Sequence, residues 1–283
     1  MVLAVVGFGN IIYIFGYTCS FIKNKSIPIF IKIDKNVCEK TYNDALIAVN
    51  YFNFNNFNIN ILTDEKMFKN GIELPNVNAL NDNSQNTYII NKTINGQCHF
   101  FHEKIMIICK NLPISFKDYD SIKNKFYNLF NQINKDEKYI AINVRRGEKL
   151  NIPKYLIASA DTYHKIINDN LDKKIIFVSD DIQWCQENFS KYDNVIFNTY
   201  NESDKIVMDQ FIMHNSYELI INSDCTFSHM PHLMKDNKIR KLTLLVKKSL
   251  YNYTINNEMS RYNVIKNYYL KNKLLDEFIV FGV

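Results

Sequence analysis

Two adjacent arginines end a short apolar run of the sequence. The run is Tyr139–Val144, and Arg145, Arg146 and Gly147 follow it directly. An arginine carries a planar fork of N–H donors that matches phosphate oxygens, and a glycine lets the backbone approach a ligand closely. These residues predict a diphosphate site at the end of a buried strand. The alternative is that one or both arginines form structural ion pairs with Asp or Glu.

Other polar stretches also stand where an expected strand ends. Ser179–Asp181 open a helix. Either Ser179 or Asp180 is its N-cap and the next acid favours the helix N-terminus, or these residues accept from a sugar or base hydroxyl or orient an arginine. Thr226 and Ser228 begin another helix, where amides and hydroxyls either hold a phosphate or only cap. The turn Gly7–Asn10 follows the first expected strand but lacks the third glycine of a dinucleotide fingerprint.

The elements that position these residues alternate between strand and helix. We expect buried strands at Val2–Val6 and Ile27–Ile33 and a helix at Thr41–Val49. The clearest amphipathic helix is Asp120–Ile133, and the polar segment Asn134–Lys138 follows it. After that segment the alternation sharpens, which predicts parallel strands in a doubly wound α/β sheet.

The polar segment also predicts a domain boundary, with one α/β domain at 1–136 and another at 137–283. Packing of the final helix back on the N-terminal domain is left open. Ligands of doubly wound sheets bind beyond the carboxyl ends of the strands, so the strand ends above predict the site.

The composition limits the classes of function. The chain has 283 residues, of which 47% are hydrophobic and 22% are charged, so it can bury a sizeable core. A net charge of +5 suits an anionic ligand but is too small to predict nucleic-acid binding. The six cysteines are scattered without a Cys-x-x-Cys pair, which predicts reduced thiols in a cytosolic protein.

The first 22 residues carry no charged side chain, which is a feature of membrane anchors and signal peptides. Gly7, Gly9 and Asn10 interrupt this stretch. We therefore expect a buried strand, a turn and a helix start, and no spanning segment.

Two histidine pairs have the spacing H-x-x-H, His99–His102 and His229–His232. A metal site needs three or four ligands that converge, and nothing in the sequence brings these pairs together. The sequence predicts no metal.

The order of these motifs resembles that of the α-1,2-fucosyltransferases, glycosyltransferase family 11. The first family motif, G-x-G-N-Q, matches Gly7, Gly9 and Asn10, with Ile11 in place of Gln. The central motif, H-x-R-R-G-D, appears as Asn143–Glu148, with Asn for His and Glu for Asp.

The C-terminal motifs follow in the same order. Phe177–Phe189 is similar to the family pattern almost throughout, and Asp209–Met213 matches D-x-x-x-M. The last motif, N-S-T-F-S-W-W, corresponds to Asp224–Met230, where His229 and Met230 replace the two tryptophans.

The resemblance implies a GT-B-like architecture of two Rossmann-like doubly wound domains with mostly parallel sheets. Residues 1–136 would face the acceptor and 137–283 would bind the GDP-sugar. It also implies inverting, metal-independent transfer of fucose from GDP-fucose to an acceptor glycan, α-1,2 to galactose. The alternatives are another GDP-sugar or acceptor, or a non-catalytic relative that binds GDP-sugar or glycan.

The resemblance also assigns residue roles. Arg145 would contact the diphosphate and help the leaving group. Glu148 would be the base, or else an ion-pair partner of Arg146 or Lys149. The residues implied to contact the donor are Gly7, Gly9, Asn10, Asn143, Arg146, Ser179, Asp180, Asp181, Asp209, Thr226, Phe227 and Ser228. We expect a cytoplasmic protein, soluble or peripheral to a membrane, with no cofactor and no nucleic-acid partner. The oligomeric state is left open.

Overall fold

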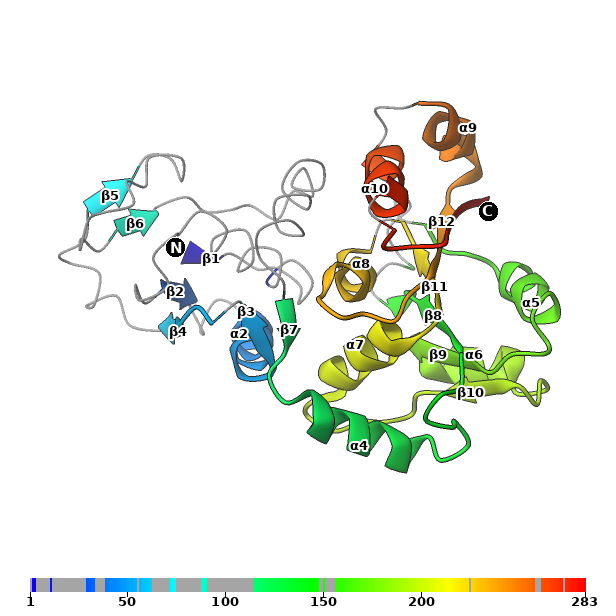
Figure 1. The fold of residues 1–283 in the computed structure, drawn as a ribbon, viewed down its shortest axis with the longest axis horizontal. Helices are drawn as coiled ribbons and strands as arrows, with labels where there is room; N and C mark the ends of the chain where they lie inside the picture. The colour runs from blue at the N-terminus through cyan, green and yellow to red at the C-terminus, as the bar shows by residue number, and fades with distance from the viewer. Residues whose placement is uncertain are drawn as a thin grey trace. The chain divides into compact units, whose positions relative to one another are not determined.

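The computed structural model of the chain divides into two compact units (Figure 1). They are Met1–Asp118 with Leu233–Lys235, and Tyr119–His232 with Asp236–Val283. The second unit therefore starts earlier in the chain than the boundary expected after residue 136. The structure describes residues 2–3, 11, 29–33, 39–54, 56–62, 72–74, 88–90, 114–147, 150, 156–223, 225–257, 261–271 and 273–283.

The described part of the first unit contains three small sheets and a helix. The order β1-β2-β4 forms a parallel sheet, β3 pairs with β7 antiparallel, and β5 pairs with β6 parallel. The elements are β1 (Val2–Leu3), β2 (Ile29–Ile33), α2 (Glu39–Tyr51), β3 (Phe52–Phe54), β4 (Ile59–Leu62), β5 (Ile72–Leu74), β6 (Tyr88–Ile90) and β7 (Ile114–Phe116).

The second unit is built on one six-stranded sheet in which every pairing is parallel. Its order is β10-β9-β8-β11-β12-β13. β8, β9 and β10 follow one another towards one edge of the sheet, and β11, β12 and β13 follow one another towards the other edge. This is the Rossmann strand order. The predicted α/β class with a doubly wound parallel sheet is confirmed. The strands are β8 (Ile140–Val144), β9 (Ile175–Ser179), β10 (Val195–Phe197), β11 (Glu218–Asn222), β12 (Lys241–Val246) and β13 (Glu277–Gly282).

Helices cover both faces of this sheet, and Figure 1 shows α7 and α8 on the side opposite to α5. The last helix, α10, contacts α9 and β13 within the same unit. The helices are α4 (Tyr119–Leu129), α5 (Ala160–Asn168), α6 (Ile182–Phe189), α7 (Lys205–Asn215), α8 (Thr226–Leu233), α9 (Lys248–Asn256) and α10 (Arg261–Lys271).

Burial on both faces explains why the central strands are mostly apolar. Every residue of β8, β9 and β11 is buried. On one face, Tyr163 of α5 and Phe189 of α6 pack on Phe177 of β9, and the rings of Phe177 and Phe189 stack with centres 5.1 Å apart. Each such fully buried side chain contributes about 1.5–3 kcal/mol through the hydrophobic effect.

Helix α7 is buried from Val207 to His214, so polar side chains that it carries are enclosed in the second unit. A helix that is enclosed nearly all round has no solvent face on which to place them. Asp209 and Gln210 are therefore inside the protein, 6% and 0% exposed.

Helix α4 ends at Leu129, earlier than the predicted end at Ile133. Phe130 and Ile133 are still buried, but they reach the core from the turns that follow the helix. Of the six cysteines, Cys185 and Cys225 are described, and both are buried free thiols. None of the described helices has the length and apolarity that a membrane crossing would require.

Candidate functional site

The carboxyl ends of β8 and β11 lie side by side at the centre of the sheet, where the strand order reverses. In doubly wound sheets this switch point is where ligands bind. β8 ends at Val144, so Arg145 and Arg146 leave the sheet at this edge. β11 ends at Asn222 and leads into the N-terminus of α8. The structure therefore brings the predicted arginine turn and the Thr226–Ser228 helix start to one edge.

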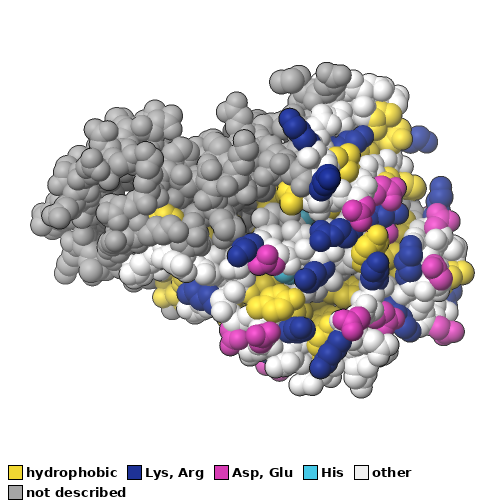
Figure 2. Space-filling view, in the orientation of Figure 1, with side chains coloured by type: hydrophobic (Ala, Val, Ile, Leu, Met, Phe, Trp, Pro, Cys, Tyr) yellow, Lys and Arg dark blue, Asp and Glu magenta, His cyan; other side chains and the backbone are white. Residues whose placement is uncertain are grey.

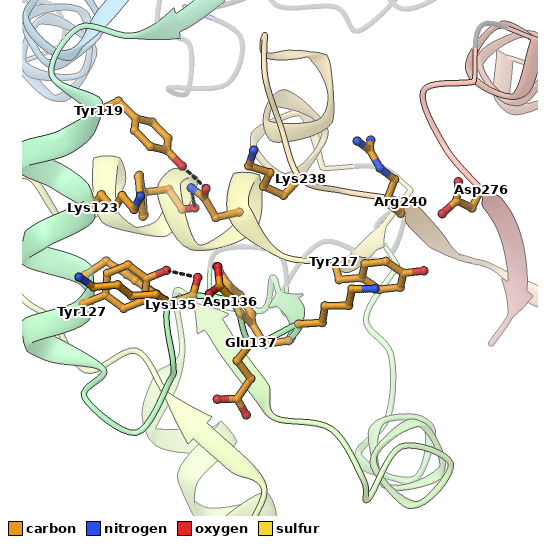
Figure 3. A pocket seen from close by; sticks show the side chains of 15 residues that line it. Tyr119, Lys123, Tyr127, Lys135, Asp136, Glu137, Tyr217, Lys238, Arg240 and Asp276 are labelled. Carbon is orange, nitrogen blue, oxygen red and sulfur yellow. Dashed lines mark hydrogen bonds between the residues drawn. The ribbon is translucent and has the colours of Figure 1, made fainter.

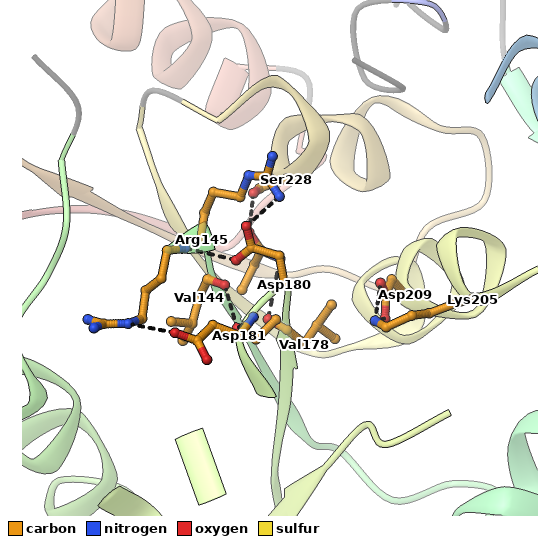
Figure 4. A network of polar contacts seen from close by, with 11 residues as sticks. Val144, Arg145, Val178, Asp180, Asp181, Lys205, Asp209 and Ser228 are labelled. Carbon is orange, nitrogen blue, oxygen red and sulfur yellow. Dashed lines mark hydrogen bonds and ion pairs between the residues drawn. The ribbon is translucent and has the colours of Figure 1, made fainter. Parts of the chain in front are cut away.

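Arg145 is oriented by Asp180, which lies at the end of the neighbouring strand. The register pairs Val144 of β8 with Ser179 of β9, so the residues that follow each strand meet. Nη1 of Arg145 lies 2.6 Å from Oδ2 of Asp180, and Oδ1 of Asp180 accepts from the backbone N–H of Arg146 at 2.8 Å (Figure 4). The Arg145 side chain is 26% exposed, so it remains accessible at the edge of the sheet.

Arg146 is held differently, between an acid and an aromatic ring. Its Nε lies 3.3 Å from Oδ2 of Asp181, and its guanidinium carbon lies 3.8 Å from the centre of the Trp184 ring. Asp181 also caps α6, because its Oδ1 accepts from the N–H of Trp184 at 3.3 Å. The cap is thus Asp181 and not Ser179 or Asp180, the capping alternatives considered from the sequence. A stacked and paired arginine fixes the position of the turn that carries it.

Ser179 ties the two strand ends together. Its hydroxyl donates to the carbonyl of Val144 at 2.8 Å and accepts from the N–H of Asp181 at 2.9 Å. Since Ser179 is only 3% exposed, both interactions lie in the interior. They fix the spacing between the arginine turn and the acidic turn.

Gly147 is required by the close approach of Asp180. A Cβ on Gly147 would lie 2.4 Å from Oδ2 of Asp180, the oxygen that binds Arg145. No side chain larger than hydrogen fits there unless the carboxylate moves away.

We expect Gly147→Ala to displace Asp180 and release Arg145, which should weaken nucleotide binding. The cost in unfolding free energy should be only about 1 kcal/mol, because the ion pair is partly exposed. The measurement is denaturant unfolding together with the nucleotide-induced melting shift. Asp180→Ala removes the clash, so adding Gly147→Ala to Asp180→Ala should cause no further change. A double variant that is worse than Asp180→Ala alone would contradict this explanation.

Asn143 and Ser228 connect β8 to the first turn of α8. The Ser228 hydroxyl donates to Oδ1 of Asn143 at 2.5 Å, and Nδ2 of Asn143 points to the carbonyl of Val178 at 3.4 Å. Nε2 of Gln210 donates to the carbonyl of Phe227, the residue before Ser228, at 2.9 Å. These contacts, made by buried side chains, anchor the N-terminus of α8 beside β8.

Asp209 projects from α7 into a separate polar cluster, drawn apart from the arginine turn in Figure 4. Its Oδ1 accepts from Nδ2 of Asn198 at 2.6 Å and from Nζ of Lys205 at 3.1 Å, and its Oδ2 lies 2.8 Å from the same Nζ. Burial raises the pKa of Asp209 above its ordinary value, while Lys205 and Asn198 act in the opposite direction. Lys205 and Asn198 were not foreseen, although Lys205 precedes Asp209 by one helical turn.

The second H-x-x-H pair forms a hydrogen-bonded chain. Nδ1 of His229 lies 3.2 Å from Nε2 of His232, which joins the two rings. At one end of the chain, Nε2 of His229 lies 3.2 Å from the carbonyl of Ser223. At the other end, Nδ1 of His232 lies 3.1 Å from the hydroxyl of Tyr269. Burial lowers the pKa of His232 well below its ordinary value, and His229 lowers it further. Among the described residues, no three His, Cys, Asp or Glu side chains are grouped as metal ligands would be.

Some predicted site residues lie outside the described part of the chain: Gly7, Gly9, Asn10, Glu148, and the first histidine pair, His99 and His102. Thr226 is placed as the first residue of α8, and only its backbone is described. The roles of these residues stay predictions. Trp184, which stacks on Arg146, was not singled out from the sequence, because no pattern of spacing marks a cation–π partner.

No protein family model and no curated protein matches the chain. The fold does match solved structures. The fucosyltransferase NodZ from Bradyrhizobium has a TM-score of 0.51 and 14% identity over 85% of this chain and 94% of that chain. A NodZ α-1,6-fucosyltransferase structure soaked with GDP-fucose has a TM-score of 0.52 and 12% identity over 85% and 93%. A family 9 glycosyl transferase from Veillonella parvula DSM 2008 has a TM-score of 0.55 and 13% identity over 100% and 85%. The chain therefore has the GT-B-like fold of these glycosyltransferases, and membership of family 11 stays a prediction.

Proposed function

We propose that the protein is a glycosyltransferase that moves fucose from GDP-fucose to a hydroxyl of an acceptor glycan, α-1,2 to galactose, with inversion and without a metal. The observation that carries the proposal is the accessible guanidinium of Arg145, held by Asp180 at the switch point of the sheet. The N-terminus of α8 starts at the same edge. The fold shared with NodZ and the order of the fucosyltransferase-like motifs support the choice of a GDP-sugar.

Arg145 and the first turn of α8 would hold the diphosphate. An arginine fork and a helix N-terminus both favour phosphate oxygens. Asp180 fixes the direction of the fork before the ligand arrives, so less ordering is left for the binding step. Arg146 already pairs with Asp181 and stacks on Trp184, which suits a residue that braces the turn.

In the proposed reaction the acceptor oxygen attacks the anomeric carbon of fucose from the face opposite to GDP. The new glycosidic C–O bond forms as the bond to the β-phosphate oxygen breaks, and the hydroxyl proton passes to a base. Glu148 is the proposed base. Charge develops on the departing GDP, and a preorganised cation such as Arg145 stabilises it most in the transition state.

A thermal-shift screen against GDP, UDP, ADP and CMP tests the nucleotide specificity. A ligand that binds only the folded state raises the melting temperature in proportion to ln(1 + [L]/Kd). GDP alone should raise it. Equal responses to all four nucleotides, or no response, would contradict the proposal.

The second candidate is a protein that uses a different GDP-sugar. Asn143 favours this candidate, because it stands where the fucosyltransferase family motif has histidine. Its side-chain amide is already bonded to Ser228 and directed at the carbonyl of Val178. Turnover of GDP-fucose and GDP-mannose, followed as GDP release with a galactoside acceptor, separates the two. Binding of GDP without release from either donor would instead indicate a non-catalytic relative.

Turnover is expected to be unaffected by EDTA. Arg145, together with the N-terminus of α8, would take the place of a metal ion beside the diphosphate. The measurement is the initial rate with EDTA and after adding back Mg²⁺ or Mn²⁺. A rate that falls with EDTA and is restored only by the metal would contradict this expectation.

A further inference from the structure

A cavity of about 600 Å³ opens in the second unit at the edge of the sheet opposite to the candidate site. Its lining includes Tyr139, Tyr217, Arg240 and Asp276, each of which directly precedes a strand, namely β8, β11, β12 and β13. Because these strands are parallel, the four residues mark the amino edge of the sheet. β8 has five residues at about 3.3 Å each, so the cavity and Arg145 are roughly 16 Å apart along the strand.

One wall of the cavity is a face of α4. Tyr119, Lys123 and Tyr127 are spaced four residues apart, so they project from the same side of the helix (Figure 3). The hydroxyl of Tyr127 donates to the carbonyl of Lys135 at 2.8 Å, and the ring of Tyr119 packs on Phe211 with centres 5.2 Å apart. These contacts fix the two tyrosine rings in place.

Basic groups that the protein leaves available line the cavity, both on α4 and on the segments that precede β8 and β12. Lys123, Lys135 and Lys238 have no ion-pair partner among the described residues. Within the described part of the chain, the Arg240 side chain makes two long hydrogen bonds of 3.4 Å to backbone carbonyls. Figure 2 shows Lys and Arg side chains gathered around hydrophobic ones on the described face of the second unit.

The acidic groups in the cavity are fewer. Glu137 is engaged with Asn134, whose backbone N–H and Nδ2 both donate to its Oε2. Asp136 and Asp276 remain without an ion-pair partner among the described side chains. The groups left for a ligand are therefore several cations, two carboxylates and the tyrosine rings.

We propose that this cavity binds an acidic saccharide, a hydroxyl-rich ring compound that carries a carboxylate or a phosphate. The lysines and Arg240 would bind the anionic group through charge-assisted hydrogen bonds. Asp136 and Asp276 would accept from sugar hydroxyls, and the ring of Tyr217, already covered by Lys138 at 4.6 Å, would close one end.

Other ligand classes fit less well. A bare phosphate leaves the two carboxylates facing a like charge, and an apolar ligand would bury the lysines without partners. The volume suits a ligand of one or two sugar rings. The proposal does not rest on the proposed transferase activity, because the cavity lies at the edge away from Arg145 and the reaction would not take place there.

The test is saturation-transfer NMR with the intact chain. The probes are glucuronic acid linked to N-acetylglucosamine, glucose 6-phosphate, neutral N-acetyllactosamine and inorganic phosphate. We expect one or both acidic sugars to bind, and their relative affinity tells whether carboxylate or phosphate is preferred. Lys123→Gln/Lys238→Gln should weaken that binding about tenfold or more, the effect of losing a hydrogen bond to a charged group. The matched control is Lys191→Gln, an exposed lysine outside the cavity, which should change nothing.

Saturating GDP should not displace the acidic sugar, and Arg145→Ala should not weaken its binding, so a failure of the proposed function leaves this test intact. The proposal is overturned if neither acidic sugar binds, if the neutral sugar or phosphate alone binds as tightly, or if the double lysine variant binds normally while its melting temperature is unchanged.

Discussion

Replacing Arg145 by alanine is expected to lower GDP-fucose turnover by about 10²–10³, the usual effect of removing one preorganised donor from a developing anion. The guanidinium stands at the end of β8 and is held by Asp180 at 2.6 Å. Charge on GDP grows as the glycosidic bond breaks, so Arg145 would bind the transition state more tightly than the donor. The loss should therefore appear mainly in kcat.

Arg145→Lys separates charge from geometry. Lysine keeps one positive charge but cannot offer two parallel N–H groups, so this variant should also be severely impaired. Kinetics with GDP-fucose give kcat and KM, and melting checks the fold. Lys191→Ala, at an exposed surface position, is the control for a lost cation. Near-normal turnover by Arg145→Ala would remove Arg145 from the proposed mechanism.

The strand ends could be predicted because buried parallel strands have a simple pattern. "YIAINV" and "KKIIFVSDD" are apolar runs closed by polar residues, and the structure places β8 and β9 within them. The meeting of Arg145 with Asp180 was harder to foresee. It depends on the register that sets Val144 opposite Ser179, and single-strand patterns do not encode a register between strands.

The surroundings of Asp209 could not be predicted for a different reason. The segment "KIVMDQFIMHN" carries apolar and polar residues on every side of the helix, so its periodicity does not distinguish an enclosed face from an open one. Enclosure is decided by contacts of α7 with β8, β9 and α4. Asn198, which bonds Asp209, comes from the loop after β10 and is far from any motif that the sequence offered.

Asp209→Asn is expected to abolish the preference for GDP over ADP. The affinity for GDP should fall about tenfold or more, because the variant loses hydrogen bonds to the guanine. A guanine edge presents two N–H donors, which a carboxylate can accept together and an amide cannot. The carboxylate already accepts from Asn198 at Oδ1 and from Lys205 at both oxygens, so guanine binding requires Lys205 to move away from Oδ1 and Oδ2. Lys205 is 29% exposed, which leaves its side chain a route towards solvent.

Asparagine retains one acceptor oxygen for Asn198, so the fold should survive with a loss of about 1–3 kcal/mol in unfolding free energy. The matched control is Asp204→Asn. Asp204 also pairs with a lysine, Lys125, at 2.9 Å and accepts from the hydroxyl of Tyr200, so its loss should cost similar stability without changing nucleotide choice. The measurements are denaturant unfolding and melting shifts with GDP and ADP. If Asp209→Asn is destabilised but still selects GDP as the parent protein does, Asp209 supports α7 from within and the guanine is recognised elsewhere.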